Sequence, residues 1–312
     1  MKIGAVVVTF NRKLLLIECL KALLEQSRPL DKIYICDNAS TDNTEELLLE
    51  KGYISDSVIV DKNQDFESSH QIKLSSGKII DIIYLRSNEN SGGAGGFSRG
   101  LERACNDMND WVWLMDDDGR PALNSLEILQ KGISNFEKLA AISCVVISKN
   151  DSSKLAFKLP VLDKSGRFMR HDGQKSFYDL KSVKNYAQSE YYPWANFFNG
   201  VLINRKAFLD VGNIKKELFI WGDEQDYLFR LFKWGKVVTS LEAFHYHPDD
   251  NKVNPPLWKV FYGFRNELYL SRVHRGNFLV RFVYISLLYL PYFLKKRALA
   301  KYFKAIYESF KL

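Results

Sequence analysis

Residues 113–119 read Trp-Leu-Met-Asp-Asp-Asp-Gly, and the prediction of the fold starts from this stretch. The apolar run from Trp111 to Met115 predicts a buried strand, which ends abruptly at three carboxylates. Adjacent acids repel one another unless a positive charge lies beside them, and hard oxygen ligands suit Mn²⁺ or Mg²⁺. We interpret Asp116, Asp117 and Asp118 as a metal-binding strand end, in preference to a solvated acidic turn.

Strands and helices alternate on both sides of this stretch. Apolar, β-branched runs predict further strands at 3–10, 33–36, 79–85 and 141–148. Helical spacing and capping residues predict helices at 14–26, 40–49, 95–108 and 123–139. The polar segments 52–78 and 149–190 are expected to be mostly loop, and shorter elements follow at 199–204, 223–234 and 236–244. This alternation indicates an α/β fold with a mostly parallel central sheet flanked by helices.

Charge is unevenly distributed along the chain. The 312 residues carry a formal charge of +7, and 46% of them are hydrophobic, as in an ordinary globular protein. From residue 252 onward there are 12 Lys and Arg but 2 Asp and Glu, which is +10 and leaves −3 for the rest. We predict a catalytic domain over 1–255, with a nucleotide-binding half at about 1–120 and an acceptor half at about 121–255. A basic, aromatic, helical C-terminal region follows over 256–312.

Three loops are expected at the same rim as the acid triplet, because the carboxyl ends of parallel strands meet at one edge of a sheet. Their polar and glycine residues include Thr9, Asn11, Arg12, Asp37, Asn38 and Gly93. A carboxylate such as Asp37 can accept the N3–H of uracil or thymine, and glycines let backbone amides approach phosphate. Arg99 can add a contact to a diphosphate. Each loop alone also fits a simple turn, but together they indicate a nucleotide pocket.

A second acidic group lies at the start of the predicted helix 223–234. Asp223, Glu224 and Asp226 fall in its first turn, where the helix dipole favours acids for structural reasons alone. One of them can also serve as a general base toward a hydroxyl, with Trp221 as a wall on which a sugar stacks. The residues themselves leave both interpretations open.

Two histidines, His245 and His247, follow the predicted strand 236–244. Residues two apart on a strand point to the same side, so the spacing indicates one metal ligand and one structural histidine. His70, His171 and His274 have no such context and are expected at the surface.

These motifs together resemble those of family 2 glycosyltransferases with the GT-A fold, over roughly residues 1–275. The resemblance rests on Val7-Val8-Thr9-Phe10-Asn11-Arg12, on residues 36–42, on the acid triplet, and on Gly222-Asp223-Glu224-Gln225-Asp226-Tyr227. Within that family, residues 90–100 and 218–224, with Phe264-Arg265-Asn266-Glu267, are most similar to bacterial galactofuranosyltransferases.

The resemblance implies roles for individual residues in a metal-dependent, inverting transfer. Glu224 corresponds to the catalytic base and Asp223 to its acidic neighbour. Asp116, Asp118 and His245 fall at the positions of Mn²⁺ or Mg²⁺ ligands, and Asp116 and Asp117 also contact the nucleotide sugar. Trp194, Asn196 and Phe198 fall in the acceptor wall, to which we add Trp221 and Asp226.

The reaction expected from this resemblance is transfer of galactofuranose from UDP-galactofuranose to a hydroxyl of a growing, lipid-linked cell-surface glycan, such as O-antigen or capsule. A rhamnosyl- or other hexosyltransferase using a dTDP- or UDP-sugar is the alternative. A sugar-nucleotide-binding protein without turnover is a third interpretation, against which the complete set of acids argues.

The apolar run 278–294 is interrupted by Arg281 and Pro291 and is followed by Lys295-Lys296-Arg297. It is short for a spanning helix, which needs about 20 apolar residues, and its basic and aromatic residues predict contact with an anionic membrane surface. Packing on the catalytic domain or a homo-oligomer contact is the alternative. No nucleic-acid recognition motif accompanies the charge.

The N-terminal apolar run is too short for a signal peptide, and Cys36 and Cys144 lie in apolar, strand-like runs that suit reduced core thiols. We therefore expect a cytoplasmic protein, peripheral at the inner face of the cell membrane.

Overall fold

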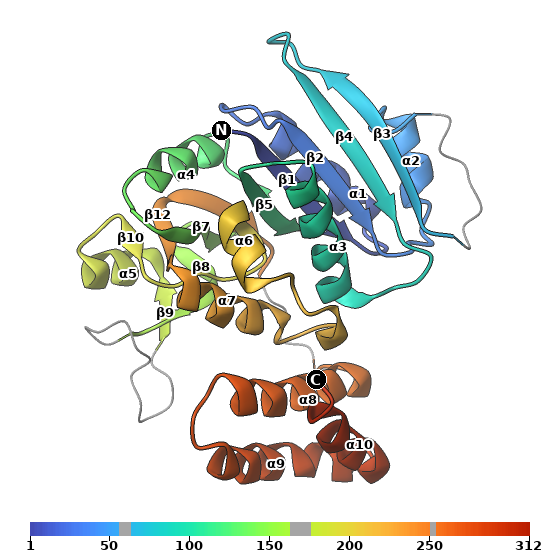
Figure 1. Ribbon diagram of the computed structural model, residues 1–312, viewed down its shortest axis with the longest axis vertical. Coiled ribbons are helices and arrows are strands. Elements are labelled where there is room, and N and C mark those ends of the chain that lie inside the picture. The colour runs from blue at the N-terminus through green and yellow to red at the C-terminus, as the bar shows by residue number, and fades with distance from the viewer. Residues whose placement is uncertain (56–63, 163–175, 250–253) are drawn as a thin grey trace.

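The structure, a computed structural model, describes residues 1–55, 64–162, 176–249 and 254–312 (Figure 1). Its strands are β1 (Ile3–Thr9), β2 (Lys32–Asp37), β3 (Phe66–Lys73), β4 (Ile79–Arg86), β5 (Trp111–Asp116), β6 (Arg120–Pro121), β7 (Leu139–Ser148), β8 (Lys154–Pro160), β9 (Ser176–Asp179), β10 (Tyr191–Tyr192), β11 (Asn199–Asn204) and β12 (Lys236–His247). Its helices are α1 (Lys13–Leu24), α2 (Thr44–Glu50), α3 (Gly92–Asn106), α4 (Ser125–Ile133), α5 (Leu180–Ala187), α6 (Arg205–Val211), the 3₁₀ helix η2 (Lys216–Leu218), α7 (Asp223–Trp234), α8 (Leu257–Val273), α9 (Phe278–Lys295) and α10 (Leu299–Ser309).

The central sheet has the strand order β10-β12-β7-β11-β5-β1-β2-β4-β3. β1 pairs in parallel with β2 and β5, and β2 pairs in parallel with β4, whereas β3 and β11 run antiparallel to their neighbours. The predicted α/β class is confirmed. In this register Thr9 lies opposite Asp37 and Val8 lies opposite Asp116, so three strands end together at one edge.

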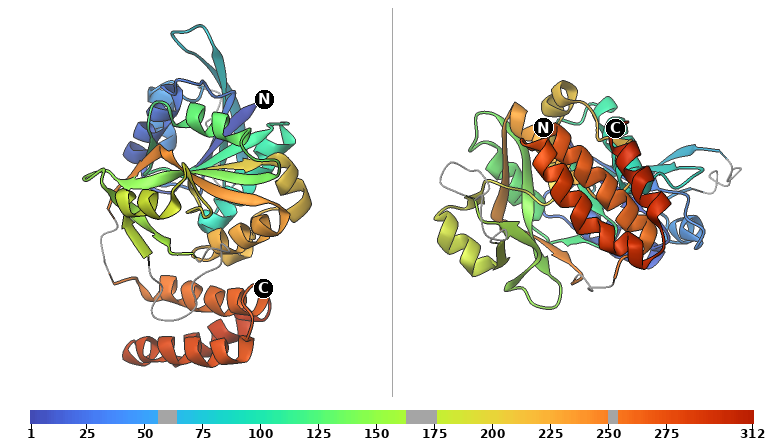
Figure 2. Two further views of the ribbon diagram at one scale, coloured as in Figure 1. Left: turned by 90° about the vertical axis from the view of Figure 1, so that its left-hand side faces the viewer. Right: turned by 90° about the horizontal axis from the view of Figure 1, so that it is seen from below.

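Helices cover both faces of the sheet (Figures 1 and 2). Val7 belongs to the apolar cluster formed with α1 and α4, whereas Val6 and Val8 belong to the cluster formed with α3 and α7. Because both faces are covered, a central strand needs apolar residues at every position. Trp111 to Met115 are all buried, which explains why the sequence of this strand is a continuous apolar run.

Several segments differ from the predictions. Within 52–78, β3 pairs with β4 at the edge of the sheet, and its side chains alternate between half-buried and exposed, so its sequence is too polar to predict a strand. Within 149–190, the described residues form β8, β9 and α5. Helix α3 begins at Gly92, so the glycines of 92–96 form its first turns rather than a preceding loop.

Helices α8, α9 and α10 form a separate unit with an apolar cluster of its own, centred on Phe264, Phe293 and Tyr302. Figures 1 and 2 show α8 between the α/β unit and α9, so that α9 lies on the side away from the sheet. The C-terminal region predicted over 256–312 is therefore helical. It contacts the sheet-bearing unit through α8 and through Leu312, whose carbonyl accepts a hydrogen bond from Lys215 Nζ at 3.1 Å and whose side chain packs near Leu218.

Candidate active site

The acid triplet closes the carboxyl end of β5 and is held by the loop after β1. Asp117 is buried, and its carboxylate accepts hydrogen bonds from Thr9 Oγ1 at 2.7 Å and from Arg12 Nη1 at 3.2 Å. Arg12 Nη1 also donates to Asp118 Oδ2 at 2.7 Å. One hydroxyl and one guanidinium therefore fix two of the three acids, and Asp116 has neither contact.

Asp116 carries the least compensated charge of the three. Burial, together with the neighbouring charges of Asp118 and Asp117, raises the pKa of Asp116 to about 8. Burial also raises the pKa of Asp117 to about 6, against the hydrogen bonds that it accepts. For Asp118, burial is outweighed by His247 and Arg12, so its pKa lies below the ordinary value. The triplet therefore has excess negative charge that a cation would neutralise.

Two histidines at the end of β12 have different surroundings. His247 Nε2 lies 3.1 Å from Asp118 Oδ1, and this partner raises the pKa of His247 despite burial of the ring. His245, the predicted ligand, is fully buried against backbone, and a Cβ on Gly119 would lie 1.9 Å from its Nε2. Burial lowers the pKa of His245 to about 3. The histidine beside Asp118 is therefore His247, and His245 packs behind it.

The donors at this edge are of the kind that Mn²⁺ and Mg²⁺ accept. Asp116 and Asp118 supply carboxylate oxygens, and His247 supplies an imidazole. Their present spacing does not enclose an ion: within the described residues, no three His, Cys, Asp or Glu side chains form such a group. The chemistry of the donor set fits a divalent cation, while Asp118 is at present paired with Arg12 and His247.

A cavity of about 690 Å³ opens at the triplet. The predicted nucleotide-side residues in its wall are Thr9, Arg12, Asn38, Gly93, Asp116 and Asp117, together with Asp118. The predicted catalytic and acceptor-side residues in its wall are Trp194, Asn196, Phe198, Trp221, Asp223 and Glu224. One cavity thus brings together most of the residues that the sequence assigned to two different substrates.

Other predicted nucleotide-binding residues form hydrogen bonds that hold the loops around this cavity. Asp37 is 1% exposed and is not part of the wall, because its carboxylate accepts from Tyr84 Oη at 2.8 Å and from the Ser40 amide at 2.8 Å. Asn11 Oδ1 accepts from the Thr41 amide at 2.7 Å. Asn38 Nδ2 donates to the Gly92 carbonyl at 2.7 Å, which fixes the start of α3 beside the loop after β2.

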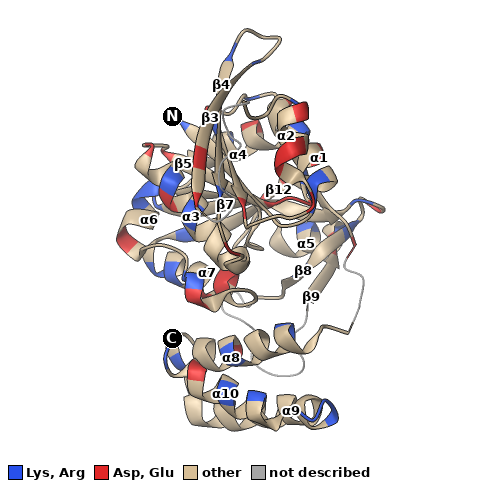
Figure 3. Cartoon of the chain, turned by 90° about the vertical axis from the view of Figure 1, so that its right-hand side faces the viewer, with Lys and Arg blue, Asp and Glu red and all other residues tan. Residues whose placement is uncertain are grey.

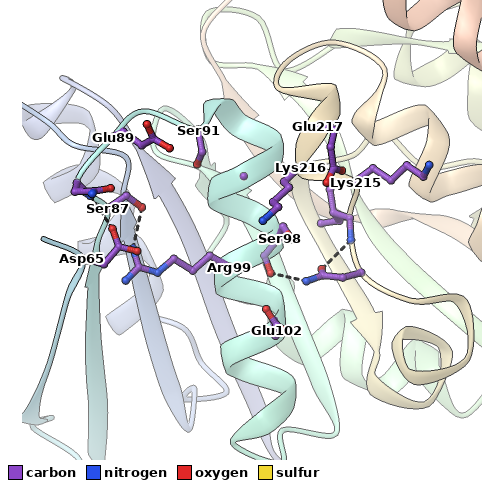
Figure 4. Close-up of a pocket in the computed structure, with 14 residues that line it drawn as sticks. Asp65, Ser87, Glu89, Ser91, Ser98, Arg99, Glu102, Lys215, Lys216 and Glu217 are labelled. Carbon is purple, nitrogen blue, oxygen red and sulfur yellow. Dashed lines mark hydrogen bonds and ion pairs between the residues drawn. The ribbon is translucent and has the colours of Figure 1, made fainter. Parts of the chain in front are cut away.

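Arg99 lines a different cavity, of about 580 Å³, whose wall includes Asp65 and residues 87–89 on one side of α3 and residues 213–217 on the other (Figure 4). Its Nη1 donates to Ser87 Oγ at 2.8 Å and lies 3.8 Å from Asp65 Oδ2. Gly93 faces the first cavity, and Arg99 follows six residues later, about 240° around a helix that turns about 100° per residue. The two residues therefore face different sides of α3, and Arg99 is directed away from the triplet.

Two of the three acids of α7 face the first cavity. Glu224 Oε2 accepts from the Gly222 amide at 3.0 Å. Burial, with the adjacent Glu224, raises the pKa of Asp223 well above its ordinary value. Asp226 is fully buried behind them and is not part of the cavity wall.

The carboxylate of Asp226 is saturated by three partners. Arg230 binds it at 2.8 Å, Tyr269 Oη donates to it at 2.9 Å, and His274 Nε2 lies 2.8 Å away. His274 was expected at the surface, but its side chain is 2% exposed because the end of α8 packs on α7. Of the other two histidines, His70 is half-buried on β3, and His171 lies outside the described residues.

Comparison with known proteins identifies the family of this chain. The family model of glycosyl transferase family 2 matches residues 5–65 and 56–180. The chain belongs to glycosyl transferase family 2. Galactofuranosyltransferase GlfT1 of Mycolicibacterium smegmatis is 30% identical to this transferase over 246 residues, which are 78% of the chain and 70% of the relative. Galactofuranosyltransferase GlfT1 of Mycobacterium tuberculosis is 34% identical over 169 residues, 53% of the chain and about half (51%) of the relative.

Solved structures show the same fold at low sequence identity. GalNAc-T7 with UDP, GalNAc and Mn²⁺ matches the transferase with a TM-score of 0.61 and 15% identity, over 89% of this chain and 49% of the other. The mannosyltransferase PcManGT from Pyrobaculum calidifontis, in complex with GDP-Man and Mn²⁺, matches with a TM-score of 0.54 and 15% identity, over 99% and 74%. The transferase therefore has the GT-A fold that its motifs predict.

The wall of the cavity also contains residues that the sequence motifs do not indicate. Trp258 and Lys259, in the first turn of α8, line the cavity with Trp221. Lys259 Nζ lies 5.9 Å from the centre of the Trp221 ring and 5.5 Å from that of Trp258. Their sequence signal is the aromatic and basic composition of the C-terminal region, which fits membrane contact equally well.

Proposed function

We propose that this transferase moves galactofuranose from UDP-galactofuranose to a hydroxyl of a cell-surface glycan, with inversion at the anomeric carbon. The observation that carries the proposal is the shared cavity, whose wall contains the acid triplet and the Asp223–Glu224 pair. The name of the 30% identical relative, galactofuranosyltransferase, supports the choice of sugar. A lipid-linked acceptor agrees with the exposed apolar helices at the C-terminus.

In the proposed reaction Glu224 is the base. It removes the proton of the acceptor hydroxyl while that oxygen forms a bond to the anomeric carbon and the bond from this carbon to the diphosphate breaks, which releases UDP. Asp223, whose pKa burial and the adjacent Glu224 raise well above its ordinary value, is the acidic neighbour of this base. Trp221, whose side chain is 40% exposed, supplies an apolar face for a sugar ring.

We assign the divalent cation to Asp116, Asp118 and His247. A bound Mn²⁺ or Mg²⁺ would supply charge stabilisation for the leaving diphosphate. Arg12 already lies at the triplet, with its Nη1 2.7 Å from Asp118 Oδ2. It would offset the same negative charge when a donor is bound.

The choice of donor is tested by measuring release of the nucleoside diphosphate in the presence of Mn²⁺, without acceptor. We expect slow hydrolysis of UDP-galactofuranose and much slower hydrolysis of UDP-galactopyranose and dTDP-rhamnose. Preferred hydrolysis of dTDP-rhamnose would favour the rhamnosyltransferase alternative. Binding of all three donors without hydrolysis would favour a sugar-nucleotide-binding protein.

We further propose that α9 and α10 rest on an anionic membrane. Leu279 and Val280 are 78% and 72% exposed, and Val283, Leu287 and Phe303 are also exposed. Figure 3 shows basic residues where α9 passes into α10, at Lys295-Lys296-Arg297, and along α10. Apolar side chains flanked by basic ones suit the interface of an anionic bilayer. By length and composition α9 would also cross a membrane, but Arg281, Pro291 and its packing on α8 favour a position at the surface.

The membrane proposal predicts that Val283→Glu with Leu287→Glu abolishes flotation with phosphatidylglycerol vesicles. The control is Leu209→Glu, because Leu209 is 58% exposed on α6 of the catalytic unit. The control variant should float like the wild type. Wild-type flotation should be weaker, but not lost, in high-salt buffer, because salt screens the attraction between the basic residues and the anionic lipid. If the double variant floats like the wild type, this face does not carry the membrane contact. If wild-type protein does not float and the double variant converts an oligomer to a monomer, the face is an interface between copies.

A further inference from the structure

The segment that links η2 to α7, residues 218–222, holds an unusual backbone. Phe219, Trp221 and Gly222 have φ angles of 65°, 58° and 108°, in the region that side chains other than glycine rarely adopt. A bulky residue stays there only where its surroundings impose the conformation. This segment, which we call the catalytic loop, therefore depends on what packs against it.

Helix α8 supplies those surroundings through Asn266. The side-chain Nδ2 of Asn266 donates to the carbonyl oxygens of Leu218 at 2.8 Å, Ile220 at 2.9 Å and Trp221 at 2.7 Å. Asn266 is 1% exposed, so its side-chain amide makes these bonds out of contact with solvent. The side-chain amide of Asn266 thus binds three backbone carbonyls of the catalytic loop.

Arg265 fixes the orientation of that amide. Its Nε donates to Asn266 Oδ1 at 2.9 Å, so the Nδ2 group is the one that faces the loop. Its Nη2 donates to the Glu217 carbonyl at 2.7 Å and to the Leu218 carbonyl at 3.2 Å. The side chains of Arg265 and Asn266 therefore donate to every backbone carbonyl from residue 217 to residue 221 except that of Phe219.

The Phe219 carbonyl points the other way, toward the donor side of the cavity. It accepts a hydrogen bond from the Ala94 amide at 3.1 Å, in the first turn of α3. At its other end, the catalytic loop donates from the Gly222 amide to Glu224 at 3.0 Å. The loop therefore connects the helix at the nucleotide side with the proposed base, and Asn266 holds it from behind.

Glycines allow α8 to approach this closely. A Cβ on Gly222 would lie 3.1 Å from Asn266 Cβ, and a Cβ on Gly263 would lie 3.0 Å from Cε3 of Trp221. Tyr269 and His274 bind Asp226 on α7, and Arg275 donates to Gln225 at 2.7 Å. Contacts from α8 and from the two residues that follow it thus reach both the catalytic loop and the helix that carries Glu224.

We propose that Asn266 is a positioning residue of the active site, and that α8 sets the geometry of Glu224 and Trp221 rather than only linking the catalytic unit to a membrane anchor. This inference rests on the proposed function for its kinetic part. It also implies that the apolar unit α9–α10 is coupled to the catalytic loop, since both pack on the same helix.

The test compares Asn266→Ala with Ser271→Ala in the full chain. Ser271 is a fully buried polar residue of the same helix whose hydroxyl has no hydrogen-bond partner in the structure, so its loss should have no effect. For Asn266→Ala we expect kcat for transfer to fall at least about tenfold, with the Kd for UDP changed less than about twofold. Hydrogen–deuterium exchange of the peptide spanning 217–224 should accelerate, and exchange in β1 and β5 should not.

The exchange measurement needs no substrate, so it separates the two proposals. Faster exchange confined to 217–224, in a protein that transfers no galactofuranose, would support the positioning role and defeat the proposed donor. Unchanged exchange and unchanged kcat in Asn266→Ala would overturn the positioning role. If Asn266→Ala does not fold, Arg265→Lys replaces it: this change keeps the charge but loses the forked contacts, and we expect smaller changes in the same direction.

Discussion

Replacing Glu224 with Gln is expected to reduce transfer by roughly 10²–10⁴-fold, the range that a positioned general base contributes. Gln has nearly the same shape and retains an oxygen that can accept from the Gly222 amide, which Glu224 does at 3.0 Å. The catalytic loop should therefore keep its conformation, and only the ability to take a proton is lost. Binding of UDP should be unchanged, because the triplet and the loops after β1 and β2 are not altered.

The measurement is radiolabelled galactofuranose transfer, with UDP binding followed by calorimetry. Glu217→Gln is the matched control: Glu217 belongs to the same stretch of chain but lines the second cavity with Arg99, so its loss should leave transfer intact. Retention of most activity in Glu224→Gln, with complete loss in Asp223→Asn, would move the role of base to Asp223.

The cavity was largely predictable because the chemistry of its wall is local. An apolar strand that ends in acids, polar loops after β1 and β2, and acids in the first turn of α7 each mark a strand end or a helix start. In a parallel sheet these ends meet at one edge. The residues whose surroundings were not predictable pack against segments that are distant in the sequence. Alternation along a strand predicts the same side for His245 and His247 and does not distinguish them. Gly119 and Gly200 lie close against the ring of His245, and this packing buries it.

The contribution of α8 could not be derived in the same way. Arg265 and Asn266 bind carbonyl oxygens about 45 residues earlier in the chain, and no local pattern records that a backbone carbonyl needs a partner. Asp226 and His274 are a similar case, since each was interpreted alone and their pairing buries both. Arg99 is different: once α3 is known to begin at Gly92, its direction follows from helical geometry alone.

Removal of divalent cations is expected to abolish transfer, and Mn²⁺ or Mg²⁺ should restore it. The expectation rests on Asp116, whose pKa of about 8 reflects burial beside two further acids without a cation of its own. A cation that binds there must displace the proton, so its apparent affinity should rise by about tenfold per pH unit up to about pH 8 and then level off. Calorimetric titration of Mn²⁺ between pH 6 and pH 9, with UDP present, measures this dependence.

Asp116→Asn should reduce Mn²⁺-dependent transfer by about 100-fold or more and remove most of the pH dependence of Mn²⁺ binding, because the amide has no proton to lose. Asp110→Asn is the control: Asp110 precedes the opposite end of β5, where it accepts from the Lys2 amide at 2.7 Å. Undiminished turnover in EDTA would count against a cation. In that case Arg12, which already lies against Asp117 and Asp118, would be the group that balances the leaving diphosphate, and Arg12→Ala should then cause the larger loss.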